Sequence, residues 1–249
     1  MNLHPLAERF ASLADVYEHG RPDYPPAVVG ALAAELGLAA DAPVLDLAAG
    51  TGKLSRALAA AGLDVVAVEP HGQLRERLAA GIGAERVRDG VAEDIPLAED
   101  SVAAVTVADG FHWFDQARAL TEIRRVLRPG GGLAILVTIP DWSGASWAHE
   151  LGELIHEMRP DHPFFDGPPW QEVVRGAGGW TDPREIRVTT PQPVDAGRIV
   201  DYVASMSFVA ALPGDEHTEW MGRVTALVEG GETPAEMPVQ VVIGLTETI

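Results

Sequence analysis

The chain has 249 residues, of which 37 are acidic and 18 are basic, so its formal net charge at pH 7 is −19. A chain this acidic repels a phosphate backbone and an anionic membrane surface, which disfavours nucleic acid and membrane partners. It contains no cysteine, which excludes disulfides, cysteine-ligated zinc and a thiol nucleophile. A chain of this length can bury a core large enough to fold without disulfides or metal.

The first ten residues carry charged side chains and lack the apolar core of a signal peptide. The longest strongly apolar stretch, residues 133–139, is far too short to cross a bilayer. Because the chain also lacks cysteine, we expect a cytoplasmic protein.

Between residues 25 and 132 the chain alternates between helix-like and strand-like hydrophobic patterns. Strands are predicted at residues 43–47, 64–68, 85–89, 102–108 and 133–139. Helices are predicted at residues 25–37, 53–61, 73–80 and 116–127. The apolar strands need cover on both faces, so the alternation predicts an α/β fold with a doubly wound, Rossmann-like parallel sheet.

The composition changes after residue 140. Residues 141–185 hold four of the six tryptophans and many prolines and glycines, which is typical of a lid-like insertion. Further strands are predicted at residues 184–190 and 239–246, with helices at 198–212 and 215–228 between them. No linker divides the chain, so we predict a single domain over residues 1–249.

A buried strand followed by a glycine turn and a helix, VLDLAAGTGKL at residues 44–54, carries most of the functional argument. Gly50 and Gly52 permit backbone conformations and a close ligand approach that a Cβ atom would block. The helix after the turn presents free N–H groups, which suit a nucleoside with a negatively charged end. Glu69 ends the next strand, where a carboxylate can bind both ribose hydroxyls.

Two cofactors and a purely structural turn compete for this pattern. The dinucleotide fingerprint requires a third glycine, and Ser55 stands at that position. Asp46, just before the turn, would disfavour a pyrophosphate but would suit a ligand with a cationic amino group and a sulfonium. The pattern therefore favours S-adenosylmethionine (SAM) over NAD.

The segments DLAAGTGKL (46–54) and VAVEP (66–70) resemble motif I and its successor in class I SAM-dependent methyltransferases. Other segments resemble a small-molecule branch of the methyltransferase type 11 group; they are YEHGRPDYP (17–25), GVAEDIPL (90–97), HWFD (112–115), RVLRPGG (125–131) and SMSFVAALP (205–213). The resemblance implies a mostly parallel class I sheet with an antiparallel last strand and helical lid insertions. The implied regions are cap helices (1–40), a SAM-binding core (41–140), an acceptor-side lid (141–238) and the last strand (239–249).

The resemblance also implies roles for single residues. Asp46, Gly50 and Gly52 would flank the methionine part of SAM, and Glu69 would bind its ribose. Tyr17 and Arg21 would close over its carboxylate. The other implied cofactor contacts are Ala48, Thr51, Leu54, Pro70, Ala92, Glu93, Ala108 and Phe111.

The chain departs from the family pattern at several positions. Val91 stands where relatives often carry Asp, so Glu93 would have to replace the usual carboxylate contact to adenine. Ala48 stands where glycine is commoner. Residues 137–141 read VTIPD where the branch usually reads Trp-Asn-x-Arg-Asp, and because this loop would face the acceptor, the acceptor is expected to differ too.

His112 is the candidate base or polar anchor for the methyl acceptor. It follows the strand at residues 102–108, at the end of the sheet where open α/β folds bind ligands, and its side chain can act as a base near neutral pH. The alternative is that His112 only lines the pocket. Tyr24 could pair with His112 and orient the acceptor, or it could be a packing residue.

Aromatic and sulfur-containing side chains are the candidate acceptor contacts, and any one of them could equally hold an insertion against the sheet. As a group they favour an aromatic or apolar small molecule. With Tyr24 and His112, they are Trp113, Trp142, Trp147, Phe164, Phe165, Trp170, Met206 and Phe208.

His149, Glu153 and His156 share one face of a predicted helix, a spacing that could hold a metal. Glu150 and Glu157 lie beside them, so an ordinary solvated acidic face is the better interpretation, and we predict no metal.

The sequence thus predicts an enzyme that methylates a small O, N or C nucleophile in natural product biosynthesis and releases S-adenosylhomocysteine. The small-molecule acceptor is its expected partner, with no nucleic acid and no membrane. The alternatives are methylation of tRNA or protein, a non-catalytic SAM-binding protein, and an NAD-dependent oxidoreductase.

Overall fold

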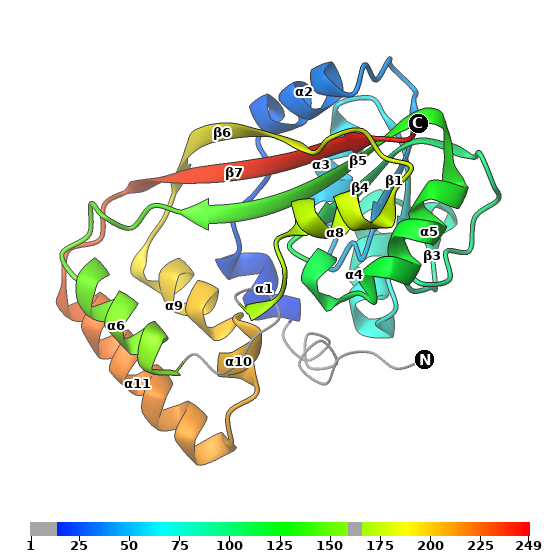
Figure 1. Cartoon of the computed structure of the whole chain (residues 1–249). Coiled ribbons are helices and arrows are strands. Elements are labelled where there is room, and N and C mark those ends of the chain that lie inside the picture. Colours follow the sequence, from blue (N-terminus) through cyan, green and yellow to red (C-terminus); the bar gives the residue numbers. More distant parts are fainter. Residues whose placement is uncertain (1–13, 159–165) are drawn as a thin grey trace. The chain divides into compact units, whose positions relative to one another are not determined.

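The structure is a computed structural model that describes residues 14–158 and 166–249 (Figure 1). Phe164 and Phe165, two predicted acceptor contacts, lie outside the described residues. The chain forms two compact units. The helical unit comprises the described parts of residues 1–22, 139–165 and 189–240, and the sheet unit comprises residues 23–138, 166–188 and 241–249.

The sheet unit is built mainly from alternating strands and helices. They are α2 (Pro26–Glu35), β1 (Pro43–Leu47), α3 (Lys53–Ala60), β2 (Asp64–Val68), α4 (Gly72–Ile82), η2 (Ala84–Arg86), β3 (Val87–Arg88), β4 (Val102–Ala108), η3 (Phe111–Trp113), α5 (Gln116–Val126) and α8 (Trp170–Ala177). Three longer strands have residues in both units; they are β5 (Leu127–Pro140), β6 (Arg184–Pro193) and β7 (Glu236–Glu247).

The helical unit contains most of the remaining helices. They are α1 (Ala14–Gly20), α6 (Ala148–Met158), α9 (Ala196–Ala204), α10 (Ser207–Ala210) and α11 (Gly214–Gly230). None of the helices within the described ranges is long and apolar enough to cross a membrane.

The seven strands form one sheet in the order β3-β2-β1-β4-β5-β7-β6. Strands β3, β2, β1, β4 and β5 pair in parallel. Strand β7 runs antiparallel to β5. Thr248 N bonds Gly131 O, and Asp141 N bonds Pro238 O, so the residue numbers increase along β5 where they decrease along β7. This arrangement confirms the predicted Rossmann-like α/β fold with an antiparallel last strand.

Alternate residues of the central strands point to opposite faces of the sheet. Val44, Ala104 and Leu136 belong to the core under α2 and α3. Leu45 and Val105, one residue further along their strands, belong to the core under α5. The strands are therefore buried on both faces, which explains why they read as continuous apolar runs.

Strand β5 begins earlier than expected from its glycines. The sequence predicted that these glycines end a helix and that the strand starts at residue 133, but pairing with β4 already begins at Leu127. The register shifts before Gly132, as in a β-bulge. A Cβ atom on Gly131 would lie 3.0 Å from Ala103 O, so glycine is needed for the strands to approach here.

The segment predicted as one insertion, residues 141–185, is divided between the two units. Its second half returns to the sheet unit, where Val174 of α8 and Trp180 join the core under α5. Trp170 packs against the same core, and its ring fills the space that a side chain on Gly244 would need. A local change in composition cannot reveal such a return, because the contacts that cause it are distant in sequence.

Candidate cofactor and active site

The glycine turn lies at the carboxyl end of β1, next to the carboxyl end of β4. The chain order reverses between these two strands, which is where open α/β sheets bind ligands. Ala48, Gly50 and Gly52 all adopt positive φ, at 57°, 58° and 87°. A bond from Gly52 N to Ala49 O, 2.9 Å long, closes the turn before α3 begins. The turn thus presents backbone N–H groups at the start of a helix.

Glycine is required at the second position of this turn for space as well as conformation. A Cβ atom on Gly52 would lie 2.6 Å from Leu78 Cδ1 of α4. At Gly50 a Cβ atom would meet no other atom within 4 Å, so the space above the turn is open. The open side of the turn is where a ligand can approach the backbone closely.

Glu69 joins the end of β2 to the glycine turn. Its Oε2 accepts a 2.9 Å hydrogen bond from Gly50 N, and its Oε1 accepts one of the same length from His71 N. The side chain is buried, and burial raises the pKa of Glu69 to about 7 although both hydrogen bonds oppose the rise. Each carboxylate oxygen has a second lone pair, which suits the two hydroxyls of a ribose.

Asp46 is buried beneath the turn and held by two hydroxyls. Ser55 Oγ donates to Oδ2 at 2.5 Å, and Thr106 Oγ1 donates to Oδ1 at 3.0 Å. Burial raises the pKa of Asp46 to about 6 against these hydrogen bonds. A buried carboxylate without an ion-pair partner costs stability, and a cationic ligand group above the turn would offset that cost.

These residues fit SAM. Thr51 Oγ1 is buried without a hydrogen-bond partner among the described residues, and it belongs to the same turn as Gly50 and Gly52. The turn therefore combines a helix N-terminus, an orphaned hydroxyl and two buried carboxylates. Ser55 occupies the position of the third glycine in the dinucleotide-binding motif, where glycine allows the helix and strand to pack closely. Here the Ser55 hydroxyl instead donates a hydrogen bond to the Asp46 carboxylate.

The residues predicted around adenine follow β3. Ala92 is buried in the core, while Glu93 is partly exposed and its Oε1 accepts a 2.7 Å hydrogen bond from Asp115 N. Pro70 O accepts a hydrogen bond from Arg75 Nη1. Leu54 and Phe111, two further predicted cofactor contacts, have side chains in the two cores of the sheet. Contact of these residues with SAM remains a prediction.

The loop after β4 approaches the glycine turn. A Cβ atom on Gly110 would lie 3.5 Å from Ala48 Cβ, which places this loop directly beside the turn. His112 follows in η3, partly exposed, and its ring centroid is 4.6 Å from that of Trp113. Ala108 ends β4 and is also partly exposed. The candidate base thus comes from the same strand end as the predicted cofactor contacts.

Sequence reasoning missed Asp109, the residue immediately after β4. Its φ is 51°, and its carboxylate accepts hydrogen bonds from Thr138 Oγ1 at 2.9 Å and from Thr138 N at 3.2 Å. Tyr24 Oη also donates to Asp109 Oδ2, at 3.5 Å. The available signal was a carboxylate that follows a buried strand directly and precedes a glycine.

Apart from Trp170, the other predicted site residues within the described ranges lie in the helical unit. Arg21 bonds Ser205 through Nε, at 2.7 Å, and its guanidinium faces the rings of Tyr17 and Tyr202. Trp147 and Phe208 are buried in the core of this unit. The structure therefore gives these last two aromatics a packing role, because a residue so enclosed has little surface for a ligand.

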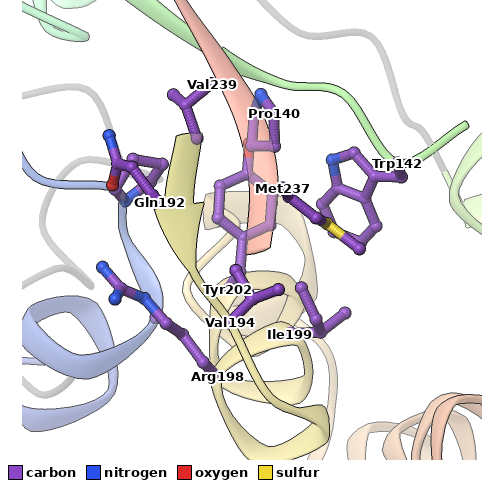
Figure 2. A pocket seen from close by; sticks show the side chains of 11 residues that line it. Pro140, Trp142, Gln192, Val194, Arg198, Ile199, Tyr202, Met237 and Val239 are labelled. Atoms are coloured by element: carbon purple, nitrogen blue, oxygen red, sulfur yellow. The ribbon is translucent and has the colours of Figure 1, made fainter. Parts of the chain in front are cut away.

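A small hollow in the helical unit includes Trp142, another predicted acceptor contact (Figure 2). Tyr202 and Met237 line it too, and the rings of Trp142 and Tyr202 meet edge to face at 5.1 Å. Its volume is about 20 Å³, roughly the room for one water molecule. Met206 packs against the core of this unit.

On α6, His149 Nε2 lies 3.5 Å from Glu153 Oε1, and both side chains are largely exposed. His156 on the same helix is also exposed. The arrangement is an exposed histidine–carboxylate contact on a solvated face.

Comparison with known proteins identifies the family. A family model for a methyltransferase domain matches residues 45–135. An uncharacterized methyltransferase of Mycobacterium tuberculosis (strain ATCC 25618 / H37Rv) is 40% identical over 223 residues, which cover 88% of this chain and 85% of that protein. A demethylmenaquinone methyltransferase of Clavibacter sepedonicus is 44% identical over 97 residues, covering 37% of this chain and 39% of that protein.

Solved structures share the fold. A protein of Anabaena variabilis ATCC 29413, assigned provisionally as a methyltransferase from an antibiotic biosynthesis pathway, aligns with a TM-score of 0.62 at 22% identity. The alignment covers 93% of this chain and 99% of that one. A protein solved in work on the conversion of a disulfide bond into a thioacetal group during echinomycin biosynthesis aligns with a TM-score of 0.57 at 19% identity, covering 97% and 91%.

The family match covers the glycine turn, Glu69 and the loop after β4. The similarity to the Mycobacterium tuberculosis protein covers 88% of the chain. The chain therefore belongs to the class I SAM-dependent methyltransferases and is an enzyme whose methyl donor is S-adenosylmethionine.

Proposed function

We propose that this methyltransferase modifies a small molecule with an aromatic or apolar body, at an O, N or C nucleophile, in natural product biosynthesis. His112 serves as the base or polar anchor for that nucleophile. The observation that carries the proposal is the position of His112, two residues beyond Gly110. A Cβ atom placed on Gly110 would lie 3.5 Å from Ala48 Cβ of the glycine turn. A side chain on this loop lies within reach of whatever is held over the turn.

The charge of the protein supports a small acceptor. At a net charge of −19 the chain repels tRNA. Trp113, adjacent to His112 and partly exposed, offers a flat apolar face on the same loop.

When bound, SAM supplies an electrophilic methyl carbon: the nucleophile's electron pair forms the new bond, the bond from sulfur to that carbon breaks, and S-adenosylhomocysteine leaves. The protein's task is to align the nucleophile and exclude water. His112 holds the nucleophile by a hydrogen bond and, where the nucleophile carries a proton, accepts it. Asp46 and Glu69 act on the donor side, beneath and beside the turn.

The test is a mass-spectrometric screen of the purified protein with SAM and a panel of phenols, indoles, amines and carboxylic acids. We expect S-adenosylhomocysteine together with one methylated product. His112→Ala should keep its affinity for SAM and lose a factor of about 10² to 10⁴ in turnover. His149→Ala, a histidine change on exposed α6, should match the wild type.

Two results would contradict the proposal. Turnover of His112→Ala close to that of wild type would remove the role of His112. Methylation of tRNA or a protein, with silence across the small-molecule panel, would replace the acceptor class.

A further inference from the structure

The helix α5 begins directly after the loop that carries His112, and its own sequence caps it only in part. Asp115 is the N-cap residue, and its Oδ1 accepts a 3.3 Å hydrogen bond from Arg118 N. In a complete capping box the third helical residue is Glu or Gln, whose side chain accepts from the N–H of the N-cap residue. Arg118 occupies this third position, and a guanidinium can only donate, so its side chain cannot accept from Asp115 N.

Glu93 provides this acceptor from another part of the chain. Its Oε1 accepts a 2.7 Å hydrogen bond from Asp115 N, although the two residues are 22 positions apart in the sequence. Glu93 belongs to the connection between β3 and β4, whereas Asp115 ends the loop after β4. The capping box of α5 is therefore completed across two loops, which ties the start of the helix to the connection after β3.

The connection that carries Glu93 is itself fixed to α5. Ile95 N donates a 3.0 Å hydrogen bond to Glu122 Oε2, and Arg125 Nη2 donates a 2.8 Å hydrogen bond to Ile95 O. Arg125 Nη2 also pairs with Glu122 Oε2 at 2.7 Å. Since Glu122 and Arg125 lie in the second half of α5, the helix holds the segment around Ile95, and Glu93 from the same segment holds the start of the helix.

His112 lies between two fixed ends of its loop. At one end Gly110 is buried, and a Cβ atom on it would lie 3.5 Å from Ala48 Cβ of the glycine turn. At the other end Asp115 N is held by Glu93. The His112 side chain between them is partly exposed, so the backbone on either side of it determines where the imidazole stands.

We propose that Glu93 is a positioning residue for the methyl transfer: it caps α5 from the connection after β3 and thereby fixes the loop that carries His112. This inference rests on the proposed function, because it needs His112 to act on the acceptor. It gives the Glu93 carboxylate a different task from the adenine contact that the family resemblance implied. Glu93 acts through His112 and transfers no proton.

Amide hydrogen exchange, followed by NMR, tests the capping bond without any turnover. In Glu93→Ala the Asp115 amide should exchange roughly tenfold faster than in wild type, because its acceptor is lost. Glu93→Gln keeps an oxygen that can accept, so the protection should stay close to that of wild type. Glu99→Ala removes an exposed carboxylate from the same connection and should leave the exchange unchanged.

Turnover and cofactor binding separate positioning from an adenine contact. With the acceptor found in the screen, Glu93→Ala should lower kcat by roughly tenfold and keep the Kd for SAM within about twofold of wild type. Glu93→Gln should restore most of kcat. An adenine contact predicts instead that the Kd for SAM rises when the carboxylate is lost, while kcat at saturating SAM is kept.

The double variant Glu93→Ala/Arg118→Glu separates the tie between the two loops from the helix cap. The new carboxylate at position 118 completes a local capping box, so the melting temperature that Glu93→Ala loses, about 2–4 °C, should be recovered. The kcat should stay low, because the start of α5 is no longer tied to the connection after β3.

Each outcome decides the role of Glu93. Equal exchange of the Asp115 amide in wild type and Glu93→Ala overturns the capping bond, whatever the activity. Recovery of both melting temperature and kcat in the double variant overturns the tie between the loops, since a local cap then suffices. A Kd for SAM that rises as much as kcat was expected to fall assigns Glu93 to the cofactor and overturns the positioning role.

Failure of the proposed function is a separate result. If His112→Ala turns over like wild type, or if no small acceptor is methylated, the proposed function fails and the role of Glu93 in catalysis fails with it. The exchange of the Asp115 amide still decides whether Glu93 holds the loop.

Discussion

The backbone N–H of Gly50 donates a 2.9 Å hydrogen bond to Oε2 of Glu69, so the cofactor turn and the end of β2 meet at one buried carboxylate. Any change in the charge of Glu69 therefore acts on the turn that is predicted to bind SAM. Burial raises the pKa of this carboxyl to about 7, so the carboxyl titrates near neutral pH.

We expect SAM affinity to fall as the pH is lowered through about 7. The ionised carboxylate accepts the ribose hydroxyls, and below its pKa a proton competes for the same oxygens, so Kd should rise by up to about tenfold per pH unit. Isothermal titration with SAM between about pH 8 and pH 6 measures this. A flat profile in wild type would contradict the assignment of Glu69.

Glu69→Gln provides the matched control for that profile. The amide keeps the size of the side chain but cannot accept from both Gly50 N and His71 N, since one oxygen is replaced by a donor. Its SAM affinity should be lower than that of wild type by about tenfold or more at pH 8 and should not vary with pH in this range.

Asp46→Asn should stabilise the ligand-free protein at alkaline pH. The pKa of Asp46 is raised from 3.8 to about 6, so between these values the unfolded chain binds fewer protons and stability falls as the pH rises. Above about pH 6 the cost is complete, on the order of 3 kcal/mol. Asparagine avoids it and keeps its partners, because Thr106 Oγ1 can turn its proton to Leu45 O.

Melting curves of the ligand-free protein at about pH 8 and pH 4 test this prediction. The variant should melt higher than wild type at pH 8 and close to it at pH 4, and it should bind SAM more weakly. A variant that melts lower than wild type at pH 8 and close to it at pH 4 would show that the charge of Asp46 supports the fold.

Gly52→Ala should lower the free energy of unfolding by more than the strain of a non-glycine residue in the left-handed backbone region would by itself. The new Cβ would lie 2.6 Å from Leu78 Cδ1, and φ is 87°. Gly37→Ala is the matched control, because φ there is 59° and no atom lies within 4 Å of the new Cβ. Urea unfolding should give a loss of about 1 kcal/mol for Gly37→Ala and about 2–4 kcal/mol for Gly52→Ala. Equal losses would show that α4 yields to the new side chain.

Gly20→Ala should disrupt the packing of α1 on α9. A Cβ atom at Gly20 would clash with Tyr202 N and the carbonyl carbon of Asp201, and backbone atoms cannot turn away as side chains do. We expect a loss of about 2 kcal/mol or more. Gly222→Ala in α11 meets no atom within 4 Å and should instead stabilise by up to about 1 kcal/mol. Thermal unfolding of both variants separates the effect of the contact between α1 and α9 from the effect of helix propensity. Similar melting temperatures for the two variants would contradict the close approach of Gly20 to the backbone of α9.

Much of the fold could be predicted from the sequence because the signals are local. Strands β1, β2 and β4 begin and end at the predicted residues, since each is a short apolar run bounded by turn residues. Strand β3 shortens to Val87–Arg88 because residues 84–86 form the 3₁₀ turn η2. The observed bounds of β7 include the predicted strand at residues 239–246. Its alternate apolar residues, Val241, Ile243 and Leu245, are buried in one core of the sheet unit, and this alternation is visible in the sequence.

The local structure of the candidate cofactor site could be predicted for the same reason. The residues that form the turn lie within seven positions, from Asp46 to Gly52, and their spacing along one strand and one helix fixes their relation. Glu69 follows by one strand and one helix, so parallel pairing brings it to the same edge.

The acceptor side was decided only by the tertiary structure. Nothing in the order of residues brings Asp109 to Thr138 and Tyr24, because each pair joins segments that meet only after β4, β5 and the segment before α2 are in place. In the same way Trp147 and Phe208 are aromatic in sequence but enclosed in a core after folding. The sequence by itself determined the strands, the turn and the methyl donor, since these depend on residues close together in the chain. Only the tertiary structure decided which polar and aromatic side chains stand beside that donor site, since a side chain's neighbours depend on how distant segments pack.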